Sequence, residues 1–217
     1  SIARKAGFEV HPNDHVNMSQ SSNDVIPTAI HVSSVVAVKE KVLPALTHLC
    51  GVIYEQEAAL LEQVKTGRTH LMDAMPVTLG QELATWRDQL MAAQKRVEAA
   101  ADDLLAVPQG GTAVGSGINA LPEFAGQFTK FLRSNMGYTF TSMEHKFTGQ
   151  SAVDGPVALS AQLRGVAIVL TKIANDLRWM NSGPIHGLAE ISLPALQPGS
   201  SIMPGKVNPV IPESVAM

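Results

Sequence analysis

The residue types best suited to chemistry gather in one irregular segment, Pro198–Pro209. Its prolines and glycines are incompatible with a helix interior or a buried strand. Lys206 and Asn208 can donate hydrogen bonds to a carboxylate, and the hydroxyls of Ser200 and Ser201 can carry a proton. A solvated connector would have a similar composition. An ammonium, an amide and paired hydroxyls on one loop between long helices nevertheless favour an anion-binding active site.

A second polar cluster precedes the first long apolar segment. Ser21, Ser22 and Asn23 stand where a helix is expected to begin, with Asn23 or Asp24 as its N-cap. The unpaired backbone N–H groups and the dipole of a helix N-terminus favour an anion. A plain capping cluster has the same composition, so the residues alone leave both interpretations open.

Two further polar segments interrupt the apolar pattern. Thr69 and His70 lie within residues 65–76, which are predicted to form a loop after a long helix. Histidine can accept a proton or orient a water molecule, although a lone histidine is more often structural. The glycine-rich segment Gly110–Asn119 is not a phosphate-binding P-loop, because no Gly-Lys-Ser/Thr follows it. Its glycines suit close helix packing or donation from the backbone.

Long apolar runs with helical spacing must hold these loops in place. Pro44 predicts a kink within the first run. No alternating strand pattern of useful length and no internal repeat is visible. The pattern therefore predicts an all-α fold, a bundle of long helices. The expected helices cover residues 25–64, 79–107, 122–135 and 151–181.

The composition narrows the class of protein. Charged residues make up 16% of the chain, against about 25% in typical soluble proteins, so we expect helix faces to be covered by other subunits or other parts of the protein. A net charge of -3 offers no basic surface for nucleic acid, and no apolar run reaches the roughly 18 residues of a membrane span. A single cysteine, Cys50, excludes an internal disulfide and fits a reducing compartment. With no signal peptide in view, a cytoplasmic location is expected.

The first segment also matches a known signature. Residues 199–208 occupy every fixed position of the pattern Gly-Ser-Ser-x-Met-Pro-x-Lys-x-Asn and resemble the fumarase/aspartase superfamily of lyases. The other polar segments resemble further signature blocks of that superfamily, so the resemblance extends over nearly the whole chain. It implies that residues 1–217 form the central helical-bundle domain of a longer protein, without its N-terminal and C-terminal domains.

The resemblance assigns roles to individual residues. It implies that Ser200, as an activated oxyanion, removes a proton from the carbon next to a carboxylate. Lys206 and Asn208 would stabilise the resulting aci-carboxylate. His70 is implied to pair with Glu213 across a subunit boundary, which would fix the imidazole tautomer. The residues implied to bind the substrate and its water are Ser21, Ser22, Asn23, Thr69 and Ser201.

A segment near the N-terminus carries a separate resemblance. His11, Asn13 and Asp14 resemble a second, surface dicarboxylate site described in fumarases. His11 and His15 are four residues apart, but Pro12 predicts that no helix forms there, and a metal site is not expected. The resemblance implies no metal and no organic cofactor.

The reaction implied is the reversible anti addition of water to fumarate, giving L-malate, by a class II fumarase-like enzyme. Gly110–Thr112, Trp179 and His70 favour this over aspartate ammonia-lyase, which uses the same loop. Residues 211–213 resemble both. Argininosuccinate and adenylosuccinate lyases share the loop more loosely.

A different class also remains open, a catalytically silent helical scaffold. The intact set of Ser200, Lys206, Asn208, His70 and Glu213 argues against lost chemistry. The low charge content predicts a homotetramer, and the resemblance implies sites shared between subunits. A chain without the flanking domains could therefore assemble and still be inactive.

Overall fold

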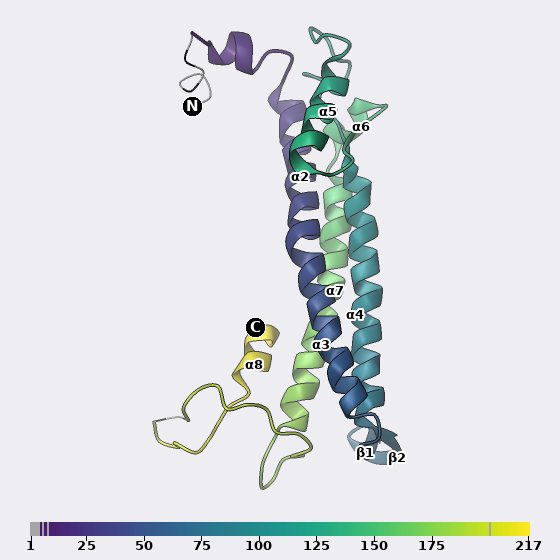
Figure 1. The fold of residues 1–217 in the computed structure, drawn as a ribbon, viewed down its shortest axis with the longest axis vertical. Coiled ribbons are helices and arrows are strands. Elements are labelled where there is room, and N and C mark those ends of the chain that lie inside the picture. Colours follow the sequence, from purple (N-terminus) through teal and green to yellow (C-terminus); the bar gives the residue numbers. More distant parts are fainter. Residues whose placement is uncertain (1–4, 6, 8, 200) are drawn as a thin grey trace. The chain divides into compact units, whose positions relative to one another are not determined.

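The computed structural model describes residues 5, 7, 9–199 and 201–217, and helices dominate this part of the chain (Figure 1). The all-α prediction is confirmed. The elements in chain order are η1 (Pro12–Val16), α2 (Ser22–Ala37), η2 (Val38–Val42), α3 (Leu43–Ala59), β1 (Val64–Thr69), β2 (Met72–Thr78), α4 (Leu79–Asp102), η3 (Asp103–Leu105), β3 (Ala106–Val107), α5 (Phe124–Met136), β4 (Thr141–Ser142), α6 (Lys146–Ser151), α7 (Asp154–Met180) and α8 (Val210–Ala216).

The chain divides into two compact units, and the boundaries between them fall inside α3, α4 and α7. The first unit contains the described residues up to Thr47 together with Gln94–Gln162. The second contains His48–Ala93 and Leu163–Met217. Each unit has its own buried apolar side chains. In the first these include Val35, Val38, Val97, Leu104 and Phe140, and in the second Ile53, Trp86, Leu90, Ile173 and Met180.

The first long helix forms as three consecutive elements, α2, η2 and α3. A kink is predicted at Pro44, and the structure has a wide π turn, η2, that ends two residues before the proline. There the Leu43 N–H donates to the Val38 carbonyl, five residues back. A proline inside a helix lacks an N–H group and crowds the preceding turn, and a locally widened turn accommodates both effects. The helix ends at Ala59 rather than near residue 64.

The start of α2 differs by three residues from the prediction. The N-cap is Ser21, not Asn23 or Asp24. The Ser21 hydroxyl accepts from the Asn23 N–H (3.2 Å), and the Asp24 carboxylate accepts from the Ser21 N–H (2.9 Å). This reciprocal capping box satisfies N–H groups that the first helical turn leaves unpaired. Pro27 lies inside the helix, one turn further on, where its missing N–H removes one intrahelical hydrogen bond.

The predicted loop over residues 65–76 is wrong, because this segment forms a β-hairpin. Strands β1 and β2 pair antiparallel, with Thr69 opposite Met72 and a bulge between Thr66 and Arg68. Most side chains of the two strands are exposed, so no apolar alternation marks them in the sequence. Gly67 is required at the bulge, since a Cβ atom there would collide with the Met75 carbonyl oxygen. Figure 1 shows the hairpin at the junction of α3 and α4.

The last long helix, α7, is unusually apolar for its exposure. It is long and apolar enough to cross a bilayer by length and composition alone, with a mean hydropathy of 1.5 in its best window, of which 22% is buried. Arg164 and Lys172 divide its apolar sequence, so no uninterrupted apolar run of about 18 residues is present in it. The core helix of a bundle in water meets the same criteria, so the finding is weak evidence for a membrane.

Candidate active site

The signature loop closes on itself and leads into α8. A Cβ atom on Gly199 would collide with the Pro204 carbonyl oxygen, so only glycine permits this approach. The Lys206 N–H donates to the Met203 carbonyl (3.0 Å), and Pro209 is the N-cap of α8. Ser200 lies outside the described residues. Ser201 and Lys206 are exposed, whereas Asn208 and Glu213 are half-buried.

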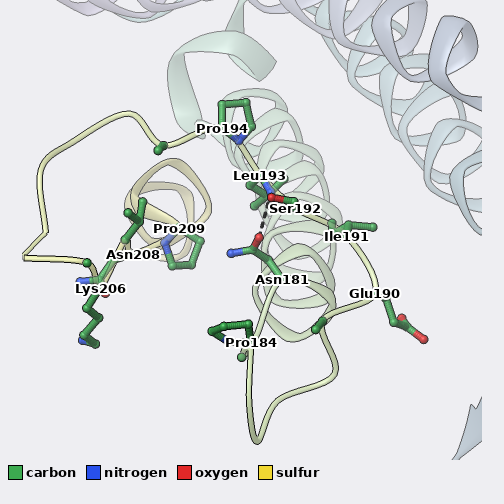
Figure 2. Close-up of a pocket in the computed structure, with 15 residues that line it drawn as sticks. Asn181, Pro184, Glu190, Ile191, Ser192, Leu193, Pro194, Lys206, Asn208 and Pro209 are labelled. Carbon is green, nitrogen blue, oxygen red and sulfur yellow. Dashed lines mark hydrogen bonds between the residues drawn. The ribbon is translucent and has the colours of Figure 1, made fainter.

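Lys206 and Asn208 line a cavity of ≈ 840 Å³. Its opposite wall is the segment after α7, residues 181–195 (Figure 2). An adjoining cavity of ≈ 460 Å³ is lined by the same two residues together with Glu213 and Arg178. Among the described residues, the Lys206 ammonium and the Asn208 amide have no side-chain partner in the chain. Both groups can therefore donate to a carboxylate that enters.

Asn181 holds the far wall of this cavity and was not predicted. Its side-chain oxygen accepts from the Leu193 N–H (2.8 Å), as the dashed line in Figure 2 shows. The Glu190 N–H donates to the Met180 carbonyl (2.8 Å), so the segment is tied to the end of α7 at two points. In the sequence, Asn181 directly follows the apolar residues of α7. Nothing there distinguishes it from an ordinary residue at a helix end.

The hairpin presents Thr69 and His70, and both are exposed. His70 and Leu71 form its two-residue turn, with φ of 55° and 63°. Two consecutive positive φ angles match the right-handed twist of paired strands, but Asn-Gly is the usual sequence for them. Histidine tolerates this region better than leucine does. His70 is thus an exposed residue of the turn at the tip of the hairpin.

Ion pairs extend along strand β1 of the hairpin, from Lys65 near its base to Arg68 near its tip. The Lys65 ammonium lies 2.7 Å from the Glu82 carboxylate and 2.9 Å from that of Glu190, and the Arg68 guanidinium lies 2.7 Å from Glu190. Burial alone would raise the pKa of Glu190, but hydrogen bonds from Lys65 and Arg68 and their charges lower this pKa below its ordinary 4.5. Burial alone would lower the pKa of Lys65, but its two carboxylate partners raise it above 10.5.

The cluster Ser21–Asn23 lies at the N-terminus of α2 in the first unit. The Asn23 amide donates to the Ala113 carbonyl (2.8 Å), which occupies one of its two N–H bonds. The fully buried Asp24 carboxylate accepts from the N–H groups of Gly110 (3.0 Å) and Thr112 (2.9 Å). The glycine-rich segment is therefore a partner of this helix N-terminus, and Asp24 was not recognised in that role.

The prediction of no helix around Pro12 is wrong. Residues Pro12–Val16 form η1, a single π turn with His11 as its N-cap. Proline is acceptable there because the first helical position needs no N–H group. The Asp14 N–H donates to Nδ1 of His11 (3.2 Å), and the His11 N–H donates to Nδ1 of His15 (3.0 Å). His11, Asn13 and Asp14 are all exposed, and nothing in the described structure tests their role as a dicarboxylate site.

The predicted residues are thus brought together only in part. Lys206, Asn208 and Glu213 share one cavity, whereas Thr69 and His70 lie at a hairpin tip. Among the described residues, no hydrogen bond or ion pair joins His70 to Glu213, and no group of three or more His, Cys, Asp or Glu side chains is arranged to hold a metal ion. The geometry supports binding and polarisation of a carboxylate at Lys206 and Asn208.

Comparisons with known proteins place these features in a family context. The family model described as Lyase matches residues 1–217. A class II fumarate hydratase of Xylella fastidiosa (strain 9a5c) is 55% identical over 100% of this chain and 46% of its own length. The class II fumarate hydratase 2 of Pseudomonas aeruginosa is 53% identical over 99% of this chain and 47% of its own length.

Solved structures agree with the fold. The class II fumarase of Schistosoma mansoni superimposes with a TM-score of 0.91 at 38% identity, covering 99% of this chain and 49% of that one. A protein of Brucella melitensis described as fumarate lyase:delta crystallin superimposes with a TM-score of 0.92 at 42% identity. The match covers 99% of this chain and 48% of the Brucella chain. This chain spans about half the length of the curated relatives that it matches.

Proposed function

The chain belongs to the lyase family, and on that premise we propose that the full-length protein is a class II fumarate hydratase, which adds water reversibly to fumarate to give L-malate. The observation that carries the proposal is the placement of Lys206, Asn208 and Glu213 around one cavity. The names of the relatives support fumarate as the dicarboxylate that such a cavity would bind.

The difficult step is the loss of a proton from carbon. This step requires a base and hydrogen-bond donors to the carboxylate that takes up the charge. In the direction from malate, a base takes the C3 proton and the electron pair moves into the adjacent carboxylate as an aci-form. The C2 hydroxyl then leaves as water after it receives a proton. Lys206 and Asn208 donate to the aci-carboxylate, where charge accumulates. Ser200 is the proposed base, and this role requires cationic surroundings that favour a serine oxyanion.

The remaining predicted residues act in binding. Ser21–Asn23 offer hydroxyls, an amide and the N-terminus of α2 to one substrate carboxylate. Thr69 and Ser201 add hydroxyls, and His70 orients the water. We further propose that His70 is paired with the Glu213 of another subunit. The exposure of His70 at the hairpin tip, away from any partner among the described residues of its own chain, supports this arrangement.

A homotetramer in the cytoplasm is part of the same proposal. Its support is the exposed apolar face of α7, which includes Val157 (61% exposed), Ile168 (65%) and Trp179 (58%). Exposed patches of this kind are unusual on monomers. Light scattering of the full-length protein at micromolar concentration measures the assembly directly, and a monomeric mass would contradict it.

Proton NMR of the full-length protein with fumarate, with and without ammonium, tests the activity. We expect malate in both samples. Aspartate formed only with ammonium would replace the proposal with aspartate ammonia-lyase, which uses the same loop. No product in either sample would favour a larger succinyl substrate or a silent scaffold.

The same NMR assay tests whether Ser200 is the base. Ser200→Ala should abolish turnover, and Ser214→Ala, the same change at an exposed position of α8, should leave it within about twofold of the unsubstituted protein. Near-normal turnover of Ser200→Ala would remove Ser200 from the mechanism.

A further inference from the structure

Four charged side chains from three parts of the chain meet beside strand β1 of the hairpin. Lys65 and Arg68 come from β1, Glu82 from α4, and Glu190 from the segment between α7 and α8. None of the four is more than 25% exposed. Ion pairs at this degree of burial are screened less by solvent than surface pairs, and Glu190 contributes to two of them.

Glu190 is the link between two loops that the proposed function needs. Its N–H group and that of Ile191 both donate to the Met180 carbonyl (2.8 and 3.2 Å), which fixes its backbone to the end of α7. Its carboxylate bonds Lys65 and Arg68 of the hairpin. Figure 2 shows this side chain directed away from Lys206 and Asn208, although all three residues line the same cavity.

The charge balance of the cluster excludes a direct role in binding an anion. Two cations face two carboxylates, so the cluster offers a dicarboxylate no net positive charge. With Glu190 removed, Arg68 would lose its ion-pair partner and Lys65 would keep only Glu82. The carboxylate thus pairs with both cations of the hairpin.

We propose that Glu190 is a positioning residue of this enzyme, which fixes the hairpin carrying Thr69 and His70 to the segment that leads into the Lys206–Asn208 loop. The inference rests on the proposed function, because it is through Thr69 and His70 that Glu190 affects turnover. A displacement of about 1 Å at such groups can cost up to roughly 100-fold in rate.

Kinetics of Glu190→Gln in the full-length protein provide the first test. Glutamine keeps the size of the side chain but loses the charge. We expect kcat for fumarate hydration to fall about 10- to 100-fold, with a smaller change in KM, while Glu190→Asp recovers part of the loss. The matched control is Glu98→Gln, which breaks an ion pair with Lys39 (3.3 Å) in the other unit and should leave kcat within about twofold.

A double-mutant cycle separates positioning from general damage. If Glu190 acts through Arg68, adding Arg68→Met to Glu190→Gln should lower kcat/KM by less than about threefold further, because the contact is already broken. Multiplicative losses in the double variant, or an unchanged kcat for Glu190→Gln, would overturn the proposal.

Amide hydrogen exchange tests whether Glu190 fixes the hairpin, and it does so without measuring activity. Glu190→Gln should speed exchange in residues 64–78 and leave residues 22–37 of α2 unchanged. Unchanged exchange in the hairpin would contradict the positioning role of Glu190. If the unsubstituted protein hydrates no fumarate, the proposed function is wrong. The exchange experiment still tests whether Glu190 stabilises the hairpin, because it does not depend on activity.

Discussion

At the scale of single residues, the Asp24 carboxylate accepts three backbone hydrogen bonds while it is fully buried. One oxygen accepts from Ser21, and the other accepts from Gly110 and Thr112. Bonds to a charged acceptor contribute more than neutral ones, and an unpaired N–H group left in the interior costs a desolvation penalty. One side chain therefore fixes both the N-terminus of α2 and the glycine-rich segment.

Asp24→Asn should lower the free energy of unfolding by about 3 kcal/mol. The asparagine amide has one acceptor oxygen, and its NH₂ group would face a backbone N–H that also needs an acceptor. Urea denaturation of the full-length protein would show the loss as a lower midpoint. Asp88→Asn, at a side chain 71% exposed beside Arg87, is the control and should change stability by less than about 0.5 kcal/mol. Equal midpoints for the two variants would refute this role of Asp24.

The sequence could predict that Ser21–Asp24 starts a helix, but not which residue caps it. Serine, asparagine and aspartate are all good N-caps, so composition alone cannot choose among Ser21, Asn23 and Asp24. The choice depends on Gly110 and Thr112, more than 80 residues away, which occupy the Asp24 carboxylate. The roles of Lys206 and Asn208 rest mainly on the signature of residues 199–208, because a solvated connector has a similar composition, and the structure adds that both residues line a cavity.

At the scale of elements, the turn of the hairpin contains a conformation that its sequence disfavours. Leu71 has φ 63° and is 75% exposed, so it has the strain of the left-handed region without burial to offset it. The segment lacks the Asn-Gly or Asp-Gly pair that normally marks such a turn. Together with Pro76 in β2 and exposed strand faces, this explains why the sequence predicted a loop.

Leu71→Gly should raise the stability of the protein by about 0.5–1 kcal/mol. Relief of the backbone strain exceeds the extra entropy that glycine has in the unfolded chain. Leu121→Gly is the matched control, because that leucine is 71% exposed and is not among the described residues with positive φ. The control should instead be destabilised by about 0.5–1 kcal/mol. A loss of stability in both variants, measured as a lower melting temperature, would show that the turn is not strained.

At the scale of the whole molecule, the long helices were predictable because their apolar spacing continues over many turns. Their ends were displaced by a few residues, since caps and turns depend on contacts that the local sequence does not contain. The low charge content has a structural counterpart in α7, where most of the apolar window is exposed in the single chain. An apolar helix face of this extent in water requires a cover, and a second copy of the chain is the proposed one.

Ile168→Glu should therefore break the assembly. The side chain is 65% exposed on α7, and a carboxylate placed in an apolar interface between helices would be buried without a partner. We expect light scattering to show a mass below that of the tetramer, and turnover to fall with it, because the proposed site draws His70 and Glu213 from different subunits. Ile168→Leu keeps the apolar area and should retain both the tetrameric mass and the activity. A tetramer that survives Ile168→Glu would show that another surface forms the interface. A dissociated but fully active variant would contradict the sharing of sites between subunits.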